Sequence, residues 1–349
     1  MTTISDALAC LRPLTDVGSG KSLLDLEWVR NPRLQGSRAI IELALPAHAN
    51  PQRDRIAKEL RAALLTLDGV EDVQIELVAS PAPEATAPQT RPIAGVKTVV
   101  AVSSGKGGVG KSTVAVNLAC ALAATGLRVG LLDADLYGPN TPIMLGLSEV
   151  APQTVEEDGQ QLLVPLESCG IAMVSMGLLI NPGQPVIWRG PMLNGVIRQF
   201  LYQVKWGERD VLVVDLPPGT GDAQLSLAQA VPMEGVVIVT TPQQVALADS
   251  RRGLAMFQQL GVPVLGVVEN MSWFAPPDQP EKRYALFGEG GGSQLATEAR
   301  VPLLAQLPLQ LPPEEGEGQP LVLSQPDSPA GVALQGLAQQ LRRRLVTPC

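Results

Sequence analysis

The chain has 349 residues, of which 45% are hydrophobic and 17% are charged, and its formal net charge at pH 7 is −8. This length accommodates two domains with a sizeable core. The acidic balance gives no electrostatic footprint for wrapping nucleic acid or an anionic membrane, so we expect neither as a partner. No apolar run approaches the roughly 18 residues of a membrane span. No secretory signal is apparent, and only four widely spaced cysteines occur. These features predict a cytoplasmic protein.

Residues 1 to 79 are expected to form a small α+β domain without an acid-base constellation. Its apolar periodicity predicts a helix over 4–11, strands over 23–29 and 39–45, a helix over 51–67 and a strand over 73–77. The single histidine, His48, falls in a strand-to-helix loop. We interpret it as an exposed loop residue, with metal ligation as the alternative.

Residues 80 to 94 contain four prolines and almost no large apolar side chain. This composition is typical of a semi-rigid, extended linker. It separates the small domain from a large one over residues 95 to 349.

The large domain alternates strands and helices. Strands are predicted over 97–103, 128–133, 171–175, 210–215, 235–240, 262–269 and 303–307, and helices over 111–125, 190–205, 222–230, 244–260, 291–299 and 331–345. Several strands are continuous apolar runs, which suit parallel strands covered on both faces. The pattern predicts a doubly wound, mostly parallel α/β sheet, in which ligands bind at the carboxyl ends of strands.

A phosphate-binding loop follows the first of these strands, where residues 105–112 read Gly-Lys-Gly-Gly-Val-Gly-Lys-Ser. Glycines let consecutive backbone N–H groups face an anion, Lys111 adds a point charge, and the Ser112 hydroxyl can bind Mg²⁺. The strand before the loop and the helix after it are the context that this motif requires. The predicted nucleotide-binding residues of the loop are Gly105, Lys106, Gly107, Gly108, Val109, Gly110, Lys111, Ser112 and Thr113.

Three carboxylates end predicted strands near this loop. Asp133 and Asp135 follow the second strand, and Asp215 ends an apolar run further on. Beside a phosphate loop, Asp135 can position the attacking water, and Asp133 and Asp215 can support a Mg²⁺ shell. The alternative for Asp135 is a cap of the following turn.

Two further segments are expected at the nucleotide. The turn Pro-Pro-Gly-Thr-Gly over 217–221 offers a backbone N–H to the γ-phosphate and can move when that phosphate leaves. Asp222 after it is expected to act in part as a helix cap. Asn270 can pair with the adenine edge, with Pro308 on the other side of the base, although an asparagine at a strand end is more often a turn former.

Five motifs of the large domain form a specific combination. They are Ser-Gly-Lys106-Gly-Gly-Val-Gly-Lys111-Ser-Thr, Asp133-Ala-Asp-Leu-Tyr-Gly-Pro-Asn140, Trp188-Arg-Gly-Pro-Met192, Asp215-Leu-Pro-Pro-Gly-Thr-Gly-Asp222 and Glu269-Asn-Met-Ser272. Together they closely resemble the Mrp/ApbC-type iron-sulfur cluster carrier ATPases, a branch of the MinD/ParA-like P-loop superfamily with a deviant Walker A motif. The resemblance covers 95 to about 310, and the small domain is similar to the one that such carriers often bear.

The resemblance implies a homodimer that binds ATP and Mg²⁺, hydrolyses ATP slowly and transfers an iron-sulfur cluster to apo acceptor proteins. In this family the first lysine of the loop, here Lys106, contacts the nucleotide of the partner subunit. We therefore assign catalysis to Lys106, Lys111 and Asp135. Arg189 is expected either at the dimer contact or as an ordinary surface charge.

One departure from the family concerns the cluster ligands. Family members usually carry Cys-x-x-Cys soon after the Glu-Asn-Met-Ser segment, but residues 273–284 contain no cysteine. A plastid and cyanobacterial-like branch is similar in lacking the pair. Cys10, Cys120 and Cys169 are expected to be structural, and Cys349 could reach a cluster only from an ordered tail. The cluster ligands are therefore not identified from the sequence.

Two rival functions remain open at this stage. A ParA/MinD-like spatial-organising ATPase would use the same dimer cycle to grip DNA or membrane, against which the acidic charge counts. A ligase-like enzyme sharing the nucleotide fold would need a substrate pocket that the sequence does not reveal. The last helix, with its Arg342-Arg-Arg344 end, resembles a membrane-surface helix, but closing the α/β domain is its commoner role.

Overall fold

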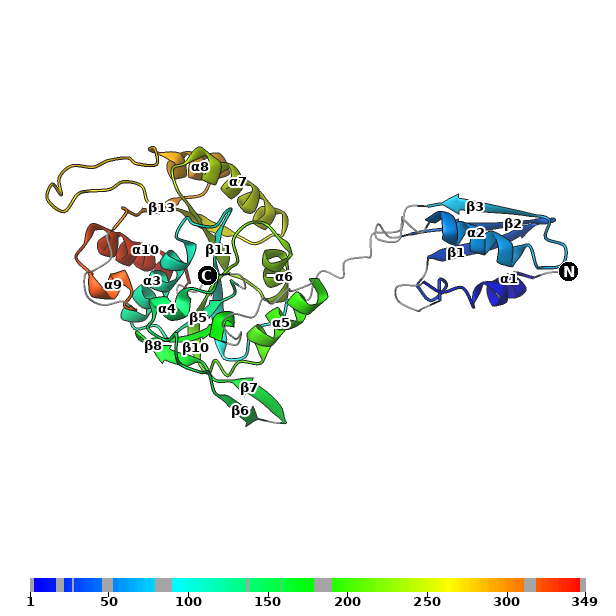
Figure 1. The fold of residues 1–349 in the computed structure, drawn as a ribbon, viewed down its shortest axis with the longest axis horizontal. Coiled ribbons are helices and arrows are strands. Elements are labelled where there is room, and N and C mark those ends of the chain that lie inside the picture. Colours follow the sequence, from blue (N-terminus) through cyan, green and yellow to red (C-terminus); the bar gives the residue numbers. More distant parts are fainter. Residues whose placement is uncertain are drawn as a thin grey trace. The chain divides into compact units, whose positions relative to one another are not determined.

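The computed structural model describes residues 3–16, 22–26, 28–45, 53–78, 90–135, 138–157, 159–178, 190–310 and 318–345. The chain divides into two compact units, Met1–Pro88 and Gln89–Cys349 (Figure 1). The division falls within the predicted linker. Residues at the end of that linker nevertheless pack on the large unit, because Arg91 N–H donates to the Ala230 carbonyl at 2.9 Å and Ile93 is buried.

The small unit is a three-stranded sheet with two helices. Its elements are α1 (Ile4–Leu11), β1 (Val29–Gln35), β2 (Arg38–Leu43), α2 (Arg53–Leu64) and β3 (Asp72–Leu77). The strand order is β1-β2-β3, with β1 antiparallel and β3 parallel to β2. Leucines of α1 and α2 and apolar residues of β2 form its buried core.

The predicted strand over 23–29 is wrong. Leu23 to Leu26 form a turn, in which the Leu26 N–H donates to the Ser22 carbonyl at 3.0 Å. Leu23 and Trp28 are buried in the small core from this compact turn. The first strand instead begins at Val29 and continues through a polar segment, which pairs with β2 and exposes alternate side chains.

The large unit is built on an eight-stranded sheet with the order β13-β12-β11-β4-β10-β5-β9-β8. Its strands are β4 (Val96–Ser104), β5 (Val129–Asp133), β8 (Leu166–Ser168), β9 (Ile171–Ser175), β10 (Arg209–Asp215), β11 (Gly235–Thr240), β12 (Val264–Glu269) and β13 (Leu303–Gln306). All neighbouring pairs are parallel except β8 and β9. This confirms the predicted mostly parallel α/β sheet, and all seven strands predicted for this domain are present.

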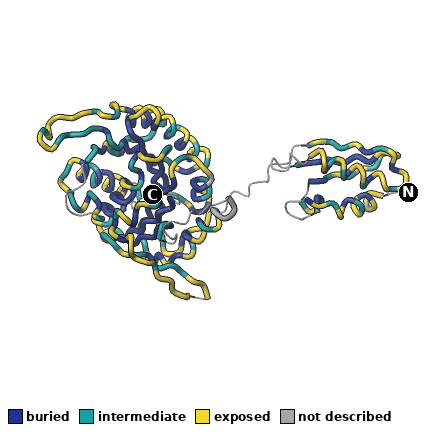
Figure 2. The backbone as a smooth tube through the Cα atoms, in the orientation of Figure 1, coloured by how far each residue is buried: buried dark blue, intermediate teal, exposed yellow. Residues whose placement is uncertain are grey.

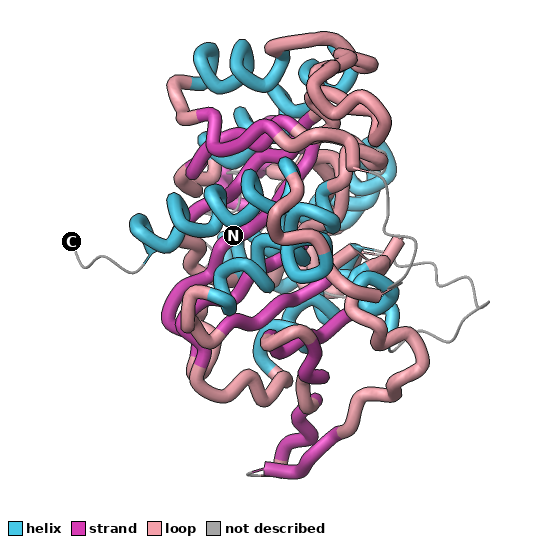
Figure 3. The backbone as a smooth tube through the Cα atoms, turned by 90° about the vertical axis from the view of Figure 1, so that its left-hand side faces the viewer, coloured by secondary structure: helices cyan, strands magenta, loops and turns pink. Residues whose placement is uncertain are grey.

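Helices cover both faces of the sheet (Figures 1 and 3). They are α3 (Lys111–Ala124), α4 (Thr141–Met144), α5 (Gly190–Tyr202), α6 (Asp222–Ala230), α7 (Gln244–Gln259), α8 (Gly291–Ala299), α9 (Leu321–Ser324) and α10 (Pro329–Leu345), with a short 3-10 turn at Met176–Leu178. Helices α3 and α10 share one apolar core with the sheet, and α5 and α6 share another on the opposite face. Buried backbone is therefore concentrated in the strands (Figure 2). In the part of the chain that the structure describes, no helix is both long and apolar enough to cross a membrane.

The hairpin formed by residues 154–157 and 160–163 was not predicted from the sequence. Strands β6 (Thr154–Glu157) and β7 (Gln160–Leu163) pair antiparallel and are mostly exposed, so they carry no apolar alternation that the sequence could reveal.

Three parallel strands bring the predicted site residues together. Strands β4, β10 and β5 are adjacent, and Asp215 is opposite Val102 on one side and Asp133 on the other. Because their carboxyl ends meet at one edge of the sheet, the phosphate loop after β4 lies beside both carboxylates.

Candidate nucleotide and magnesium site

The phosphate loop has a backbone that only glycine adopts readily. Gly108 and Gly110 have φ values of 80° and 81°, in the left-handed region that disfavours other residues. A Cβ on Gly105 would overlap the Asp249 backbone of α7, and one on Gly110 would overlap the Asn270 side chain. The glycines therefore serve both the turn and the close packing of the loop.

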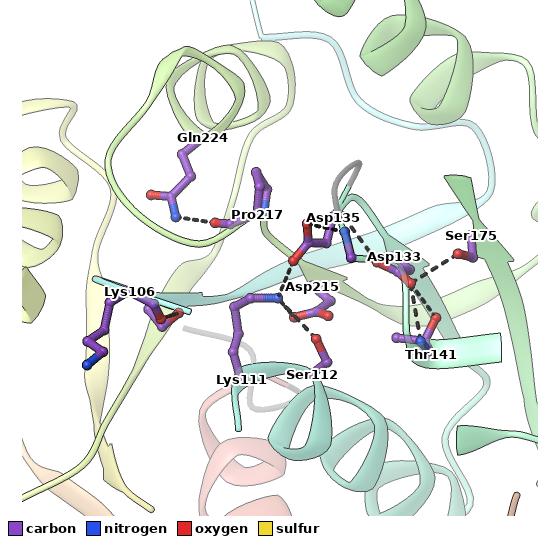
Figure 4. Close-up of polar contacts among 12 residues, drawn as sticks. Lys106, Lys111, Ser112, Asp133, Asp135, Thr141, Ser175, Asp215, Pro217 and Gln224 are labelled. Carbon is purple, nitrogen blue, oxygen red and sulfur yellow. Dashed lines mark hydrogen bonds and ion pairs between the residues drawn. The ribbon is translucent and has the colours of Figure 1, made fainter. Parts of the chain in front are cut away.

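Lys111 is held between two carboxylates at the start of α3. Its Nζ lies 2.6 Å from Asp215 Oδ1 and 3.8 Å from Asp135 Oδ2, and donates to Ser112 Oγ at 3.2 Å (Figure 4). The Lys111 side chain is 6% exposed and that of Asp215 is 0% exposed. Burial raises the pKa of Asp215, and the Lys111 charge opposes that rise. The structure thus brings Lys111, Ser112, Asp135 and Asp215 together in one cluster.

Asp133 lies at the centre of a separate set of hydrogen bonds. Its Oδ2 accepts from the hydroxyls of Thr141 at 2.7 Å and Ser175 at 3.0 Å, and its Oδ1 accepts from the Asp135 N–H at 3.1 Å. Burial, followed by the nearby Asp215 charge, raises the pKa of Asp133 to about 6. Asp133 therefore fixes the backbone that carries Asp135.

The donor set fits a magnesium ion. Asp215 Oδ2 is buried and has no hydrogen-bond partner in the described part of the chain, and Ser112 Oγ lies in the same cluster through Lys111. An unpartnered carboxylate oxygen beside a hydroxyl is the hard-oxygen environment that Mg²⁺ prefers. Both Asp133 oxygens accept from protein donors, so Asp133 fits a supporting place around the ion.

Lys106 points away from the cluster that its own loop forms (Figure 4). It is half-buried, and the Ser104 hydroxyl donates to its carbonyl oxygen at 2.9 Å. Among the described residues, no carboxylate pairs with its ammonium group. The loop backbone is thus fixed while its charge is directed outward.

The segment after β10 is tied to the phosphate-loop strand. The Leu216 N–H donates to the Val102 carbonyl at 3.0 Å, and the Gly219 N–H donates to the Ser104 carbonyl at 3.0 Å. We name residues 216–221 the switch loop. The side chain of Asp222, predicted as a helix cap, lies outside the described residues, although α6 does begin there.

Asn270 reaches the phosphate loop from the end of β12. Its Nδ2 donates to the Val109 carbonyl at 2.9 Å. A mainly apolar cavity of about 210 Å³ opens beside it and is also lined by Thr113, Met271 and Pro308. The two residues that the sequence suggested for the base therefore line one cavity next to α3.

Sequence reasoning missed the residues that support these groups. Thr141 and Ser175 hold Asp133, and buried Glu269 accepts from the Gly292 N–H at 2.5 Å and from Gln306 Nε2 at 2.9 Å. Ser175 ends a predicted strand and Glu269 begins the Glu-Asn-Met-Ser motif, which was the available signal. Their partners lie far away in the sequence, so no local pattern identified them.

No disulfide joins the described cysteines. Cys10 and Cys169 are partly buried and Cys120 is buried, and all three are free thiols. Burial raises the pKa of Cys120 to about 12, which agrees with the core position predicted for it. No group of three or more potential metal-binding side chains occurs within the described ranges. His48, Arg189 and Cys349 lie outside those ranges.

The site consists of a glycine loop between a strand and a helix, with a buried lysine-carboxylate pair at the edge of a mostly parallel sheet. This arrangement defines a P-loop NTPase. Comparison with protein families refines that class. Residues 95–342 match the family described as NUBPL iron-transfer P-loop NTPase. Residues 4–77 match the one described as iron-sulfur cluster assembly protein. The chain belongs to the iron-transfer P-loop NTPase family, which confirms the resemblance inferred from its motifs.

Individual relatives match between 72% and 98% of this chain. An iron-sulfur cluster carrier protein of Synechocystis is 54% identical over 343 residues, 98% of this chain and 97% of that protein. The Arabidopsis thaliana iron-sulfur protein required for NADH dehydrogenase is 48% identical over 72% of this chain and 80% of its own length. A solved nucleotide-binding protein from Archaeoglobus fulgidus, in complex with ADP, is 35% identical over 73% of this chain and 90% of its own, with a TM-score of 0.54. These relatives favour a cluster carrier over the ParA/MinD-like alternative.

Proposed function

We propose that this protein is an ATP-hydrolysing carrier that binds an iron-sulfur cluster and transfers it to apo acceptor proteins. The observation that carries the proposal is the buried Lys111 beside Asp215 and Asp135, within a chain whose family is that of iron-transfer NTPases. The cluster is the cargo of this cycle, and the cytoplasm is its proposed location.

In the proposed cycle the loop residues Gly105 to Thr113 bind the phosphates of ATP. Their N–H groups and the amino end of α3 face the anion, and Lys111 exchanges its Asp215 contact for phosphate oxygens. Asp135, held by the Asp133 hydrogen bonds, orients the attacking water. The side of Asn270 not bound to Val109 faces the adenine in the cavity that Pro308 also lines.

Ser112 and Asp215 would hold Mg²⁺, with Asp133 supporting its surroundings, and the ion would neutralise charge on the β- and γ-phosphates. This assignment is supported by the unpartnered Asp215 Oδ2. Protein freed of divalent cations with a chelator should bind ATP more weakly and regain affinity when Mg²⁺ is added. Asp215→Asn should lose most of that gain.

Lys106 is proposed to act on the ATP of a second subunit. Its outward direction (Figure 4) and the absence of a carboxylate partner among the described residues support a role outside its own site. Such a role requires a homodimer in which two ATP molecules are enclosed at the interface. Sedimentation of the protein with ADP and with a non-hydrolysable ATP analogue tests this requirement, because the analogue should favour the dimer.

The candidate sulfur ligands are the cysteine thiols of the chain. A cluster with four protein ligands that is shared by two identical subunits needs two ligands from each. We propose anaerobic reconstitution with iron and sulfide, followed by transfer to an apo ferredoxin. Cys10, Cys169 and Cys349 would each be replaced by serine, and Cys120→Ser serves as the control because its buried thiol has a pKa raised to about 12.

The expected outcome is a cluster spectrum that at least one of the substitutions of Cys10, Cys169 and Cys349 removes and that Cys120→Ser preserves. Transfer to the acceptor should depend on ATP. A protein that hydrolyses ATP but neither binds nor transfers a cluster would reject the carrier half of the proposal. In that case ATP-dependent binding to liposomes or DNA would revive the ParA/MinD-like alternative.

A further inference from the structure

Gln224 has a polar side chain that the cycle above does not use. It lies in the first turn of α6, directly after the switch loop, and is 1% exposed. Its Nε2 donates to the Pro217 carbonyl at 2.5 Å, whereas its buried Oε1 has no hydrogen-bond partner among the described residues. Buried polar atoms are almost always paired, so the unpaired Oε1 of Gln224 is unusual.

The switch loop is held from two sides. On one side the Leu216 and Gly219 N–H groups are bound to carbonyls of β4, the strand that leads into the phosphate loop. On the other side Gln224 binds Pro217 from α6. The loop therefore contacts both the strand that leads into the phosphate loop and helix α6. The side chain of Gln224 makes the contact with α6.

Gln224 does not contact the phosphate-binding cluster. Figure 4 shows its side chain coming from α6 toward Pro217, apart from Lys111 and Asp215. Any effect on hydrolysis must act through the switch-loop backbone. This makes Gln224 a positioning residue.

We propose that Gln224 is a two-position latch for the switch loop. In the resting shape its Nε2 binds the Pro217 carbonyl, and in the ATP-bound shape its Oε1 accepts a backbone N–H of the same loop. This inference rests on the proposed ATP cycle and deepens it. A glutamine amide offers a donor and an acceptor on one side chain, so it can hold two arrangements of opposite hydrogen-bond polarity. The unsatisfied Oε1 disfavours the resting shape, which allows nucleotide binding to shift the balance.

Three variants separate the two halves of the latch. Gln224→Leu removes donor and acceptor, Gln224→Glu keeps acceptors and removes the donor, and Gln229→Leu alters an exposed glutamine of the same helix as a control. The readout is hydrogen exchange of the amides of Leu216, Gly219, Thr220 and Gly221, since Pro217 and Pro218 have none, with ADP and with a non-hydrolysable ATP analogue. The wild type and the control should show slower exchange with the analogue. Gln224→Glu should exchange fast with ADP but remain protected with the analogue, and Gln224→Leu should exchange fast with both.

Steady-state kinetics give a second readout. Gln224→Leu should lower kcat for ATP hydrolysis by about tenfold while KM stays within about threefold, because loop positioning and not ATP binding is lost. Wild-type kcat together with a wild-type exchange difference in Gln224→Leu would overturn the latch. If that variant does not fold, the ADP-specific loss of protection in Gln224→Glu decides alone. A wild-type protein that binds no ATP would instead refute the proposed function, and calorimetry detects that separately.

Discussion

The buried pair of Lys111 and Asp215 allows a quantitative prediction for the nucleotide-free protein. The two atoms are 2.6 Å apart, and both side chains are almost entirely buried. Replacing Lys111 by methionine leaves a buried carboxylate without its cation and with Asp135 nearby. Breaking such a pair by removing one partner costs about 3–5 kcal/mol.

Calorimetry of the large unit should detect this loss. For a unit of this size, 1 kcal/mol corresponds to about 2–4 °C in Tm, so Lys111→Met should lower Tm by roughly 6–20 °C. The measurement is made without nucleotide or Mg²⁺. The double variant Lys111→Met/Asp215→Leu should recover much of the loss, because it replaces the pair by apolar groups of similar size.

An exposed ion pair provides the control. Lys97→Met breaks an ion pair to Asp210 in which the lysine is 62% exposed, so it should change stability by less than about 1 kcal/mol.

Removing Lys111 should also raise the pKa of Asp215 further, since burial already raises it and the lysine opposes that rise. A raised folded-state pKa gives stability that is present at low pH and lost as pH increases. The deficit of Lys111→Met should therefore shrink as pH falls. A single variant with unchanged Tm, or a double variant with additive losses, would refute this reasoning.

Three other predictions use independent parts of the structure. Lys106→Ala should slow ATP hydrolysis by ~10³-fold or more while calorimetry still detects nucleotide binding, and unchanged turnover would eliminate the role in trans. Hydrogen bonds from Arg128 hold the pKa of Asp210 below its usual range. The resulting stabilisation is present above about pH 4 and is lost as pH falls, so the Tm difference between wild type and Asp210→Asn should narrow in acid, and a constant difference would contradict it. Gly130→Ala should lower Tm, because its Cβ would lie 2.8 Å from Leu212 and 3.1 Å from the Trp206 ring; a neutral effect in thermal unfolding would show that the core relaxes.

The family and the large domain could be predicted well because their signals are local. The phosphate loop needs glycines at fixed spacing between a strand and a helix, and Gly108 and Gly110 have the left-handed backbone that this spacing suggests. The sheet strands are buried on both faces, so their sequences are continuous apolar runs. Such features can be recognised in the sequence without knowledge of tertiary contacts.

The small unit shows where local patterns fail. Leu23 and Trp28 resemble strand residues because they are apolar, but they reach the core from a turn. The strand that follows is mostly polar, because one face of the sheet is not covered by apolar packing. Short strands such as β6 and β7 were not predicted because they are mostly exposed and therefore lack apolar alternation.

The sequence by itself determined the glycine-lysine pattern of the phosphate loop, the seven apolar strands of the large domain and the positions of the carboxylates that end or follow them. Only the tertiary structure decided which of these groups touch. Lys111 meets Asp215 across 104 positions, and Asn270 meets Val109 across 161. Parallel strands joined by helices bring distant segments to one sheet edge, and a hydrogen bond depends on that final placement to within fractions of an ångström. The same reason explains why Gln224, an ordinary residue in the sequence, acquires its contact with the switch loop only in the folded chain.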